Sequence, residues 1–363
     1  MWEKAIPPWP DELELSVLGP GFGESILVHA GQGHWIAVDS CVSAEGDCAA
    51  LKYLEAIGVS PLNVKQIIVT HWHNDHIRGM SELLARCEKA EFFCPTVFIE
   101  GDFLEFVAAN SEKDISPLGA STSDLAQCFQ VLLDRKQEPR FVGPDRVLSN
   151  IADPPLQVFS LSPNDARIRQ FLQLIGQHRA QRGQTRRAVR DLHPNLVSVV
   201  VRIVFGNDAI LLGADLQENP YGGWSTIIAT SKVLSGPKAT LFKVPHHGSE
   251  NAHADAQWTD LLNNPASVLT PYNKGAHRLP TVADVQRIRK LSATAYSCAR
   301  LSSVAPRKLD PSVARSLAEG KIKLRTADVK MGHVQFRRRD SDAPGAWVPT
   351  LFGNAVTLDQ IFR

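Results

Sequence analysis

The stretch Val69–Gly79 reads VTHWHNDHIRG, and it places three histidines and an aspartate within six positions. It follows the apolar run VKQIIVT (64–70), which is typical of a buried strand, and it precedes a helical pattern. A strand that ends at Thr70 opens into a tight loop, where residues one to three positions apart can point into one cavity. A histidine-rich surface turn is the alternative, but the context favours a site.

Imidazole and carboxylate are the usual protein ligands of Zn²⁺ where no thiolate is offered. Four donors from so short a loop can hardly converge on a single tetrahedral ion. They can serve two ions a few ångströms apart, which together clamp a displacement transition state. We therefore predict a two-metal site, with one ion on His71 and His73 and the other on Asp75 and His76.

The composition is that of an ordinary globular protein. The chain has 363 residues, of which 44% are hydrophobic and 21% charged, so it is long enough to bury a large core. A formal net charge of +1 argues against bulk attraction to nucleic acid or to an anionic membrane.

The cysteines and the N-terminus indicate a reduced compartment. The six cysteines form no CxxC pair, so neither a disulfide framework nor a cysteine-rich zinc knuckle is predicted. The segment MWEKAIPPWPDELEL has acidic residues and prolines where a signal peptide needs an apolar core. No stretch approaches the ~20 apolar residues of a membrane span. We expect a cytoplasmic protein without a membrane partner, and the sequence leaves the oligomeric state open.

Strand and helix patterns alternate along most of the chain, which predicts an α/β core. The run PTVFIE (95–100), for example, is predicted to be a strand. Helix-like segments dominate residues 101–194, and the alternation then resumes. We expect one domain over residues 1–363, with 101–194 as a mainly helical insertion; insertions of this kind commonly build or cover a site.

The histidine loop matches the H-x-H-x-D-H signature of the metallo-β-lactamase superfamily of dinuclear hydrolases. Asp39, which closes HWIAVDS, resembles the family's first motif. Asp215 ends ILLGAD, which resembles the motif of the carboxylate that bridges the metals, and KVPHHGS (243–249) resembles the last histidine motif. The resemblance implies a four-layer αββα sandwich, in which two mixed β-sheets are flanked by helices.

One branch of the family is more similar than the rest. GPGFGESILV (19–28) is similar to the G-Q-G-D-S-I-L-I opening of the hydrolase domain attached to bacterial competence (DNA-uptake) channels, and PYNKGAHRLP (271–280) is a degraded form of another of its motifs. This chain has Glu24 where that branch has Asp, and it lacks a channel-like membrane domain, so DNA import is not implied. Related soluble members include phosphodiesterases and phosphorylcholine esterases.

The resemblance also implies a third histidine on the first ion, before the bridging Asp215. We prefer His193, which directly precedes a strand pattern, over His178, which lies in an arginine-rich helical stretch. Asn195 is a further alternative, because the competence branch often has Asn near this point; the first ion would then be weakly held or absent.

The remaining roles follow from the same resemblance. His247 is assigned to the second ion and His246 to a phosphate contact or proton donor, although the two could be exchanged. Asp39 is expected to fix the geometry of the ligands. His277 either reaches the substrate or is a surface histidine.

Seven arginines and no acidic residue occupy 167–190. The planar guanidinium suits phosphate oxygens, so Arg186 and Arg187 are predicted to contact substrate. A solvated basic helix or linker is the alternative.

Together these features predict a hydrolase with two Zn²⁺ ions, or Mn²⁺, that acts through a metal-bridging hydroxide oriented by Asp75. His246 or a metal-bound water would protonate the leaving oxygen. The expected substrate is an anionic phosphodiester: a nucleic acid, a nucleotide or a phosphorylated headgroup. The alternatives are a carbon-centred hydrolase of a lactam, lactone or thioester, and a non-catalytic binding module stabilised by metal.

Overall fold

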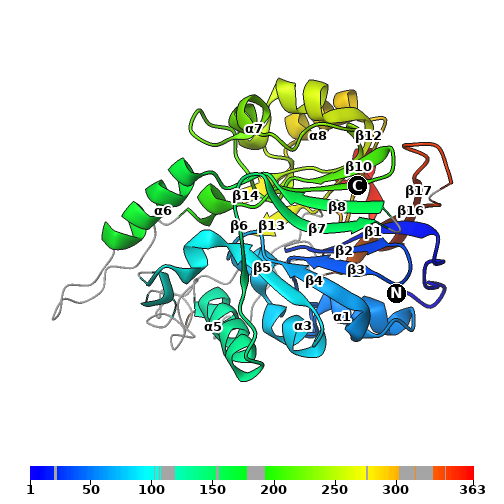
Figure 1. The fold of residues 1–363 in the computed structure, drawn as a ribbon. Coiled ribbons are helices and arrows are strands. Elements are labelled where there is room, and N and C mark those ends of the chain that lie inside the picture. Colours follow the sequence, from blue (N-terminus) through cyan, green and yellow to red (C-terminus); the bar gives the residue numbers. More distant parts are fainter. Residues whose placement is uncertain are drawn as a thin grey trace.

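The computed structural model describes residues 1–363 apart from 20–22, 102, 106, 108–118, 153–154, 178–192, 275–276, 302–314, 316–329 and 340. Two mixed eight-stranded sheets lie face to face, with helices on both outer faces (Figure 1). The predicted four-layer αββα architecture is confirmed. None of the helices in the described part of the chain combines the length and the apolar composition needed to cross a bilayer.

The first sheet is antiparallel at one end and parallel at the other. From β17 to β3 neighbouring strands are antiparallel, and from β3 to β6 they are parallel. The strand order is β17 (Val348–Gly353), β16 (Gly332–Arg339), β1 (Glu12–Gly19), β2 (Ser25–Ala30), β3 (Trp35–Val38), β4 (Val64–Ile68), β5 (Glu91–Pro95) and β6 (Arg140–Val142).

The second sheet repeats this plan. Strands β7 to β10 are antiparallel, β10 to β12 and β15 are parallel, and β18 closes the edge. The order is β18 (Val356–Thr357), β15 (Thr294–Ser297), β12 (Leu262–Leu269), β11 (Ala239–Lys243), β10 (Asp208–Leu212), β9 (Val201–Phe205), β8 (Pro155–Ser160) and β7 (Arg146–Ala152). A separate hairpin pairs β13 (Tyr272–Lys274) with β14 (His277–Leu279).

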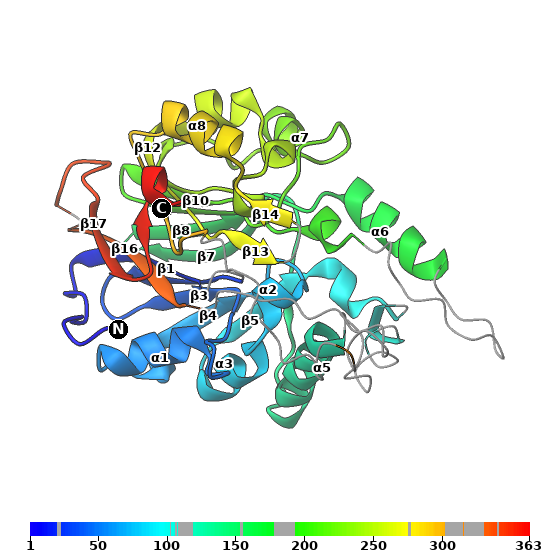
Figure 2. The same cartoon turned by 180° about the vertical axis from the view of Figure 1, so that it is seen from behind.

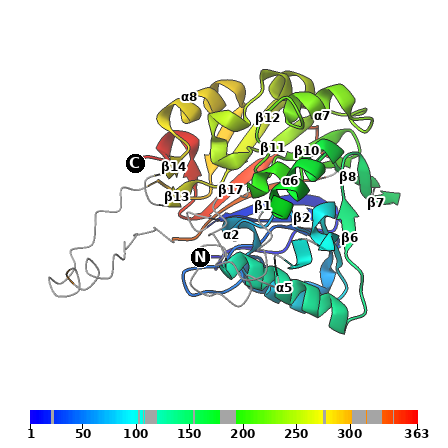
Figure 3. The ribbon, with the colours of Figure 1, turned by 90° about the vertical axis from the view of Figure 1, so that its left-hand side faces the viewer.

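The helices cover the outer faces of the two sheets. On the first sheet lie α1 (Ala49–Ala56), α3 (Met80–Arg86) and α5 (Gly119–Asp134), and on the second α7 (Trp224–Thr230) and α8 (Val282–Leu291). Helix α6 (Asp165–Gln177) projects to the left in Figure 1 and faces the viewer in Figure 3. Figure 2 places the short helix α2 (Asn74–Ile77) and the β13–β14 hairpin between the two halves.

Three apolar clusters hold the layers together. The central cluster contains residues of both sheets, such as Leu15 and Ile36 of the first and Ile203 and Ile210 of the second. The other two clusters pack each sheet against its helices. The central strands are therefore buried on both faces, which explains why β4 and β10 read as nearly continuous apolar runs rather than as alternating patterns.

Two expectations about secondary structure need correction. PTVFIE (95–100) is not a strand, because β5 ends at Pro95 and Thr96–Ile99 form a 3₁₀ helix. Residues 101–194 contain α5 and α6 but also β6, β7 and β8, which belong to the two sheets. The middle of the chain thus completes the core as well as adding helices to it.

A buried polar chain ties the N-terminal segment to the first sheet. The indole N–H of Trp2 donates to Nδ1 of His333 (3.0 Å), and Nε2 of His333 donates to Ser16 Oγ (2.8 Å). Ser16 donates in turn to Glu14 (2.5 Å), which Arg337 also contacts. Burial, together with the charge of Arg337, lowers the pKa of His333 to about 3. This imidazole is therefore neutral in the folded protein.

We predict that His333 makes folding sensitive to acid. Its folded-state pKa lies below the ordinary value of 6.5, so its contribution is complete above pH 6.5 and is lost as the pH falls toward 3. Between pH 6.5 and 5, wild type should lose about 2 kcal/mol more unfolding free energy than a His333→Asn variant, at about 1.4 kcal/mol per pH unit. Urea unfolding at both pH values measures this difference, and parallel pH profiles would contradict it.

Candidate metal centre

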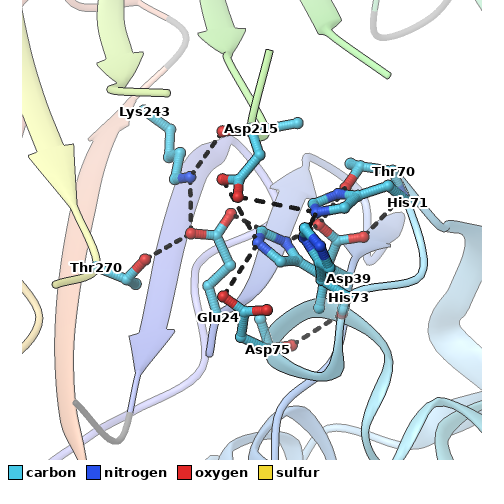
Figure 4. A network of polar contacts seen from close by, with 12 residues as sticks. Glu24, Asp39, Thr70, His71, His73, Asp75, Asp215, Lys243 and Thr270 are labelled. Atoms are coloured by element: carbon cyan, nitrogen blue, oxygen red, sulfur yellow. Dashed lines mark hydrogen bonds and ion pairs between the residues drawn. The ribbon is translucent and has the colours of Figure 1, made fainter. Parts of the chain in front are cut away.

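The loops that carry the predicted site residues all follow parallel strands. Asp39 comes directly after β3, and His71 lies shortly after β4. On the second sheet, Asp215 follows β10 and the pair His246–His247 follows β11. Carboxyl ends of parallel strands share one edge of a sheet, and ligands commonly bind there. The carboxyl-terminal edges of the two sheets lie next to each other, so residues far apart in sequence converge between the sheets (Figure 4).

Four of these residues form what we call the four-donor group: Asp75, His76, Asp215 and His247. One donor atom from each lies within 4.8 Å of the others. Nε2 of His247 is 3.2 Å from Asp75 Oδ2, and Nε2 of His76 is 3.5 Å from Asp215 Oδ1.

A second set, the three-donor group, consists of His71, His73 and Asp215. Nε2 of His71 lies 3.1 Å from Nδ1 of His73 and 3.8 Å from Asp215 Oδ2. Asp215 belongs to both groups, as a carboxylate between two ions would. Asp75 and His76 thus belong to the four-donor group and His71 and His73 to the three-donor group, although His71 and His76 also lie near each other in a further set with Asp39.

The donor set fits a pair of cations. Nε2 of His76 and Oδ1 of Asp215 are both buried, face each other, and have no hydrogen-bond partner. A buried polar atom without a partner costs free energy, which a shared metal ion would offset. Carboxylate and imidazole are also the ligand types that Zn²⁺ and related ions take. Both groups are therefore candidate metal positions.

Asp39 orients the histidine loop. Its Oδ1 accepts from the backbone N–H of Thr70 (2.7 Å), and its Oδ2 accepts from the Thr70 hydroxyl (2.6 Å) and from Nδ1 of His76 (2.7 Å). The last bond fixes the His76 ring so that Nε2 points toward Asp215. The Thr70 hydroxyl also lies 3.0 Å from Nδ1 of His71, which leaves Nε2 of that ring for the three-donor group.

The protonation states agree with this division. Burial, with His76 nearby, lowers the pKa of His71 well below its ordinary value, so this imidazole offers a lone pair. Burial opposes the ionisation of Asp215, but His247 and His76 beside it hold the pKa of the carboxyl well below its usual range. Burial likewise opposes the charged form of His247, yet Asp215 and Asp75 raise the pKa of that ring. The negative charge of the carboxylates thus favours a cation here.

The backbone around the site is held in an uncommon conformation. Asp39, Ala214, His246 and His247 all have φ between +45° and +57°. This left-handed region costs a non-glycine residue of order 1–3 kcal/mol, and such strain persists only where the surroundings impose it. Adjacent left-handed residues at His246 and His247 turn the two rings apart, with centroids 6.0 Å from each other.

This turn explains why the two neighbouring histidines differ. His247 is buried, and its Nδ1 donates to the carbonyl of Thr270 (3.0 Å) while Nε2 faces the carboxylates. His246 is only partly buried, and its Nδ1 contacts Oδ1 of Asn251 (2.8 Å). The geometry thus places His247 rather than His246 in the four-donor group.

Other predicted site residues are not brought to either group. His193 is exposed and precedes the 3₁₀ helix Pro194–Val197, so the structure gives no support for it as the third histidine. Asn195 is buried, and its Oδ1 has no hydrogen-bond partner. His277 lies in β14, but its side chain is outside the described part of the structure. His178, Arg186 and Arg187 lie wholly outside the described residues.

Three further residues line the site without having been predicted: Glu24, Lys243 and Thr270. Glu24 and Lys243 are completely buried and form an ion pair of 2.7 Å, and the Thr270 hydroxyl donates to the same carboxylate (2.5 Å). A lysine inside the apolar run ATLFKVP was the available signal, since a buried lysine requires a partner.

Comparison with known proteins supports the superfamily. The model of the family described as the metallo-beta-lactamase superfamily matches residues 18–101, which include Asp39 and the histidine loop. Over 149 residues the chain is 26% identical to the Anti-Pycsar protein Apyc1 of Paenibacillus sp. (strain J14). That alignment covers 39% of this chain and 58% of the relative, so the chain spans less than two thirds of the relative's length.

Similar solved structures include the metallo-beta-lactamase fold protein YhfI from Bacillus subtilis, at 14% identity and a TM-score of 0.37, over 71% of this chain and 85% of that one. A putative metallo-beta-lactamase from Thermotoga maritima is 16% identical with a TM-score of 0.32, over 59% of this chain and 88% of that one.

We predict that Asp39→Asn weakens metal binding about 10- to 100-fold, because the amide cannot accept from both Thr70 and His76. Zinc titration of metal-free protein against a chromophoric chelator measures this loss. Asp208→Asn is a matched control, since Asp208 is also fully buried and is bonded to Thr240 (2.6 Å), whereas it belongs to neither donor group. Equal zinc affinity in wild type and Asp39→Asn would refute the assigned role.

Proposed function

We propose that this protein is a metal-dependent hydrolase of phosphodiesters. The observation that carries the proposal is the sharing of Asp215 between two donor groups, with the partly exposed ring of His246 next to them. Two divalent ions held by these groups would lower the pKa of a water nucleophile and neutralise negative charge that develops during the displacement. Supporting evidence comes from the superfamily match over residues 18–101.

Two side chains around the ions would each carry out one proton transfer, Asp75 at the attacking water and His246 at the leaving group. Asp75 is only partly buried, and its Oδ2 faces Nε2 of His247 at 3.2 Å, where both atoms would hold the same ion. The other oxygen is available to orient the attacking water and accept its proton. Burial opposes ionisation of Asp75, but the neighbouring His76 and His247 keep its pKa below the ordinary value, so the carboxylate is charged at neutral pH.

His246 is the proposed acid for the leaving group. Asn251 accepts from Nδ1 of His246 at 2.8 Å, which directs the opposite ring nitrogen away from Asn251. The backbone carbonyl of Asn251 accepts from the N–H of Glu218 (2.8 Å), so the main chain that carries this amide is held. In its protonated form, with Nδ1–H held by Asn251, the ring can pass its Nε2 proton to the alkoxide as the ester bond breaks, which leaves a neutral imidazole.

The choice of a phosphodiester rests on the similarity of GPGFGESILV to the competence-type branch and on the arginines after position 166. Arg167 and Arg169 lie on α6, and the other five arginines of that stretch are outside the described residues. The suggested substrate class therefore includes nucleic acids, nucleotides and phosphorylated headgroups. Charge attraction by guanidinium groups is the expected basis of recognition.

We predict that protein loaded with Zn²⁺ or Mn²⁺ hydrolyses bis-(p-nitrophenyl) phosphate and leaves a chromogenic cephalosporin intact. Chelator should abolish the activity, and Asp75→Ala should lower kcat/KM at least about 100-fold, because the group that receives the proton is lost. Asp255→Ala, at an exposed position, is the control and should match wild type. Cleavage of the cephalosporin alone would indicate a carbon-centred hydrolase, and an active Asp75→Ala would reject the mechanism.

We further predict that the loss of hydrolysis rate caused by His246→Ala depends on the leaving group of the substrate. Loss of a general acid should slow a dinucleotide, which has a poor alkoxide leaving group, about 100-fold, whereas bis-(p-nitrophenyl) phosphate should lose less than about tenfold. Asn251→Ala should shift both rates in the same direction by a smaller factor. Steady-state kinetics on the two substrates tests this, and an equal loss on both would exclude His246 as the proton donor.

A further inference from the structure

An ion pair without solvent exposure lies directly behind the candidate metal centre. Nζ of Lys243, the last residue of β11, is 2.7 Å from Oε2 of Glu24, which precedes β2. Thr270, which follows β12, donates its hydroxyl to the same oxygen. The three side chains therefore join the first sheet to the second at the edge where the donor groups lie (Figure 4).

Glu24 contacts two residues of the four-donor group. Its backbone N–H donates to the carbonyl of Asp75 (2.8 Å). Its second carboxylate oxygen, Oε1, is buried without a hydrogen-bond partner and lies 3.7 Å from Nδ1 of His76. Glu24 thus supports the backbone of one ligand and faces the ring of another.

Lys243 supports the turn that presents Asp215. Its Nζ donates to the carbonyl of Ala214 (3.2 Å), which also accepts from the backbone N–H of His246 (3.0 Å). Ala214 is in the left-handed conformation, with φ of +45°, immediately before Asp215. Two donors on one carbonyl hold this unfavourable turn in place.

Thr270 connects Glu24 to the remaining residue of the four-donor group, His247. Its hydroxyl is bonded to Glu24 (2.5 Å), and its carbonyl accepts from Nδ1 of His247 (3.0 Å). Each residue of the four-donor group is thus contacted by Glu24, Lys243 or Thr270, directly or through the adjacent peptide. Within the described residues, neither Glu24 nor Lys243 hydrogen-bonds or ion-pairs with His71 or His73 of the three-donor group.

Stability alone does not account for a buried pair of this kind. Removing two charges from water is costly, and well-packed apolar residues in their place are often at least as stable. Burial alone would lower the pKa of Lys243, but Glu24, followed by Asp215, raises it above the ordinary value, so the ammonium stays charged. The pair contacts Asp75 and His76 through Glu24, and the turn before Asp215 through Lys243, so it acts on the geometry of these ligands.

We propose that Glu24 and Lys243, locked by Thr270, are positioning residues that set the metal affinity of the four-donor group and leave that of the three-donor group largely unchanged. The inference rests on the metal centre of the proposed function and not on its substrate. Asp215 is shared, but it supplies one donor of three to the second group, whereas each residue of the first group is contacted by Glu24, Lys243 or Thr270, directly or through the adjacent peptide.

The test is the double variant Glu24→Gln/Lys243→Met, which removes both charges with little change in volume. Zn²⁺ titration of the metal-free full-length protein, followed with a chromophoric chelator, resolves two binding steps. We expect one step to weaken 10- to 100-fold and the other by less than about threefold. Asp75→Ala and His73→Ala identify which step belongs to which group, and Co²⁺ absorption spectra report the altered ligand geometry directly.

The matched control is Glu14→Gln/Arg337→Met, which removes an ion pair (2.7 Å) between the buried Glu14 and the partly buried Arg337, neither of which belongs to a donor group. This control variant should leave the affinities of both Zn²⁺ binding steps unchanged, even if its thermal unfolding temperature changes. Unchanged zinc binding in a folded Glu24→Gln/Lys243→Met variant would overturn the inference, and equal weakening of both steps would overturn the selectivity.

A milder pair of variants keeps the test decisive should the double variant not fold. Thr270→Val removes the hydroxyl bond to Glu24, and Thr240→Val removes an equivalent buried bond to Asp208 (2.6 Å). Thr270→Val alone should weaken the same step at least about threefold; identical titrations would refute the proposal. Wild type that binds two ions but cleaves no phosphodiester would remove the proposed function and leave this inference standing.

Discussion

Three carboxylates, those of Glu24, Asp39 and Asp215, are buried between two apolar sheets, and the site is organised by how each charge is compensated. An unpaired buried charge is prohibitively costly. Glu24 is paired with Lys243, and Asp39 accepts from Thr70 and His76. Asp215 lies beside the rings of His76 (3.5 Å) and His247 (3.7 Å), and one of its oxygens has no hydrogen-bond partner. The demand for positive charge is thus concentrated where both donor groups meet.

What sequence could predict was the part that local pattern encodes. The histidine loop, Asp39 and Asp215 each follow an apolar strand run, and the crowding of four donors into one short loop predicts that two ions share them. The αββα fold was predicted because the resemblance to a known family supplied the topology. Single-strand patterns supplied its pieces, and β4 (Val64–Ile68) lies where the run VKQIIVT (64–70) predicted it.

The remainder depends on tertiary contacts that no local pattern carries. Glu24 and Thr270 are 246 positions apart, and only the meeting of two sheets makes them neighbours. PTVFIE has strand composition, yet Thr96–Ile99 turn into a 3₁₀ helix after β5, and Val97 and Phe98 pack into the outer cluster with the helices. His193 has suitable chemistry and precedes a strand, but the local backbone leaves it exposed.

Among the residues that the structure describes, one group has four donors and the other three, which suggests a division of work between the two positions. Four protein donors saturate a tetrahedral ion, as in structural zinc sites, whereas three leave one coordination position open, as in catalytic sites. The four-donor group is also the one held on every side by Asp39, Glu24, Lys243 and Thr270. The three-donor group has fewer supports, of which Thr70 is one. A rigid, closed position beside an open one would let the first ion fix Asp215 while the open position accommodates water or a substrate oxygen.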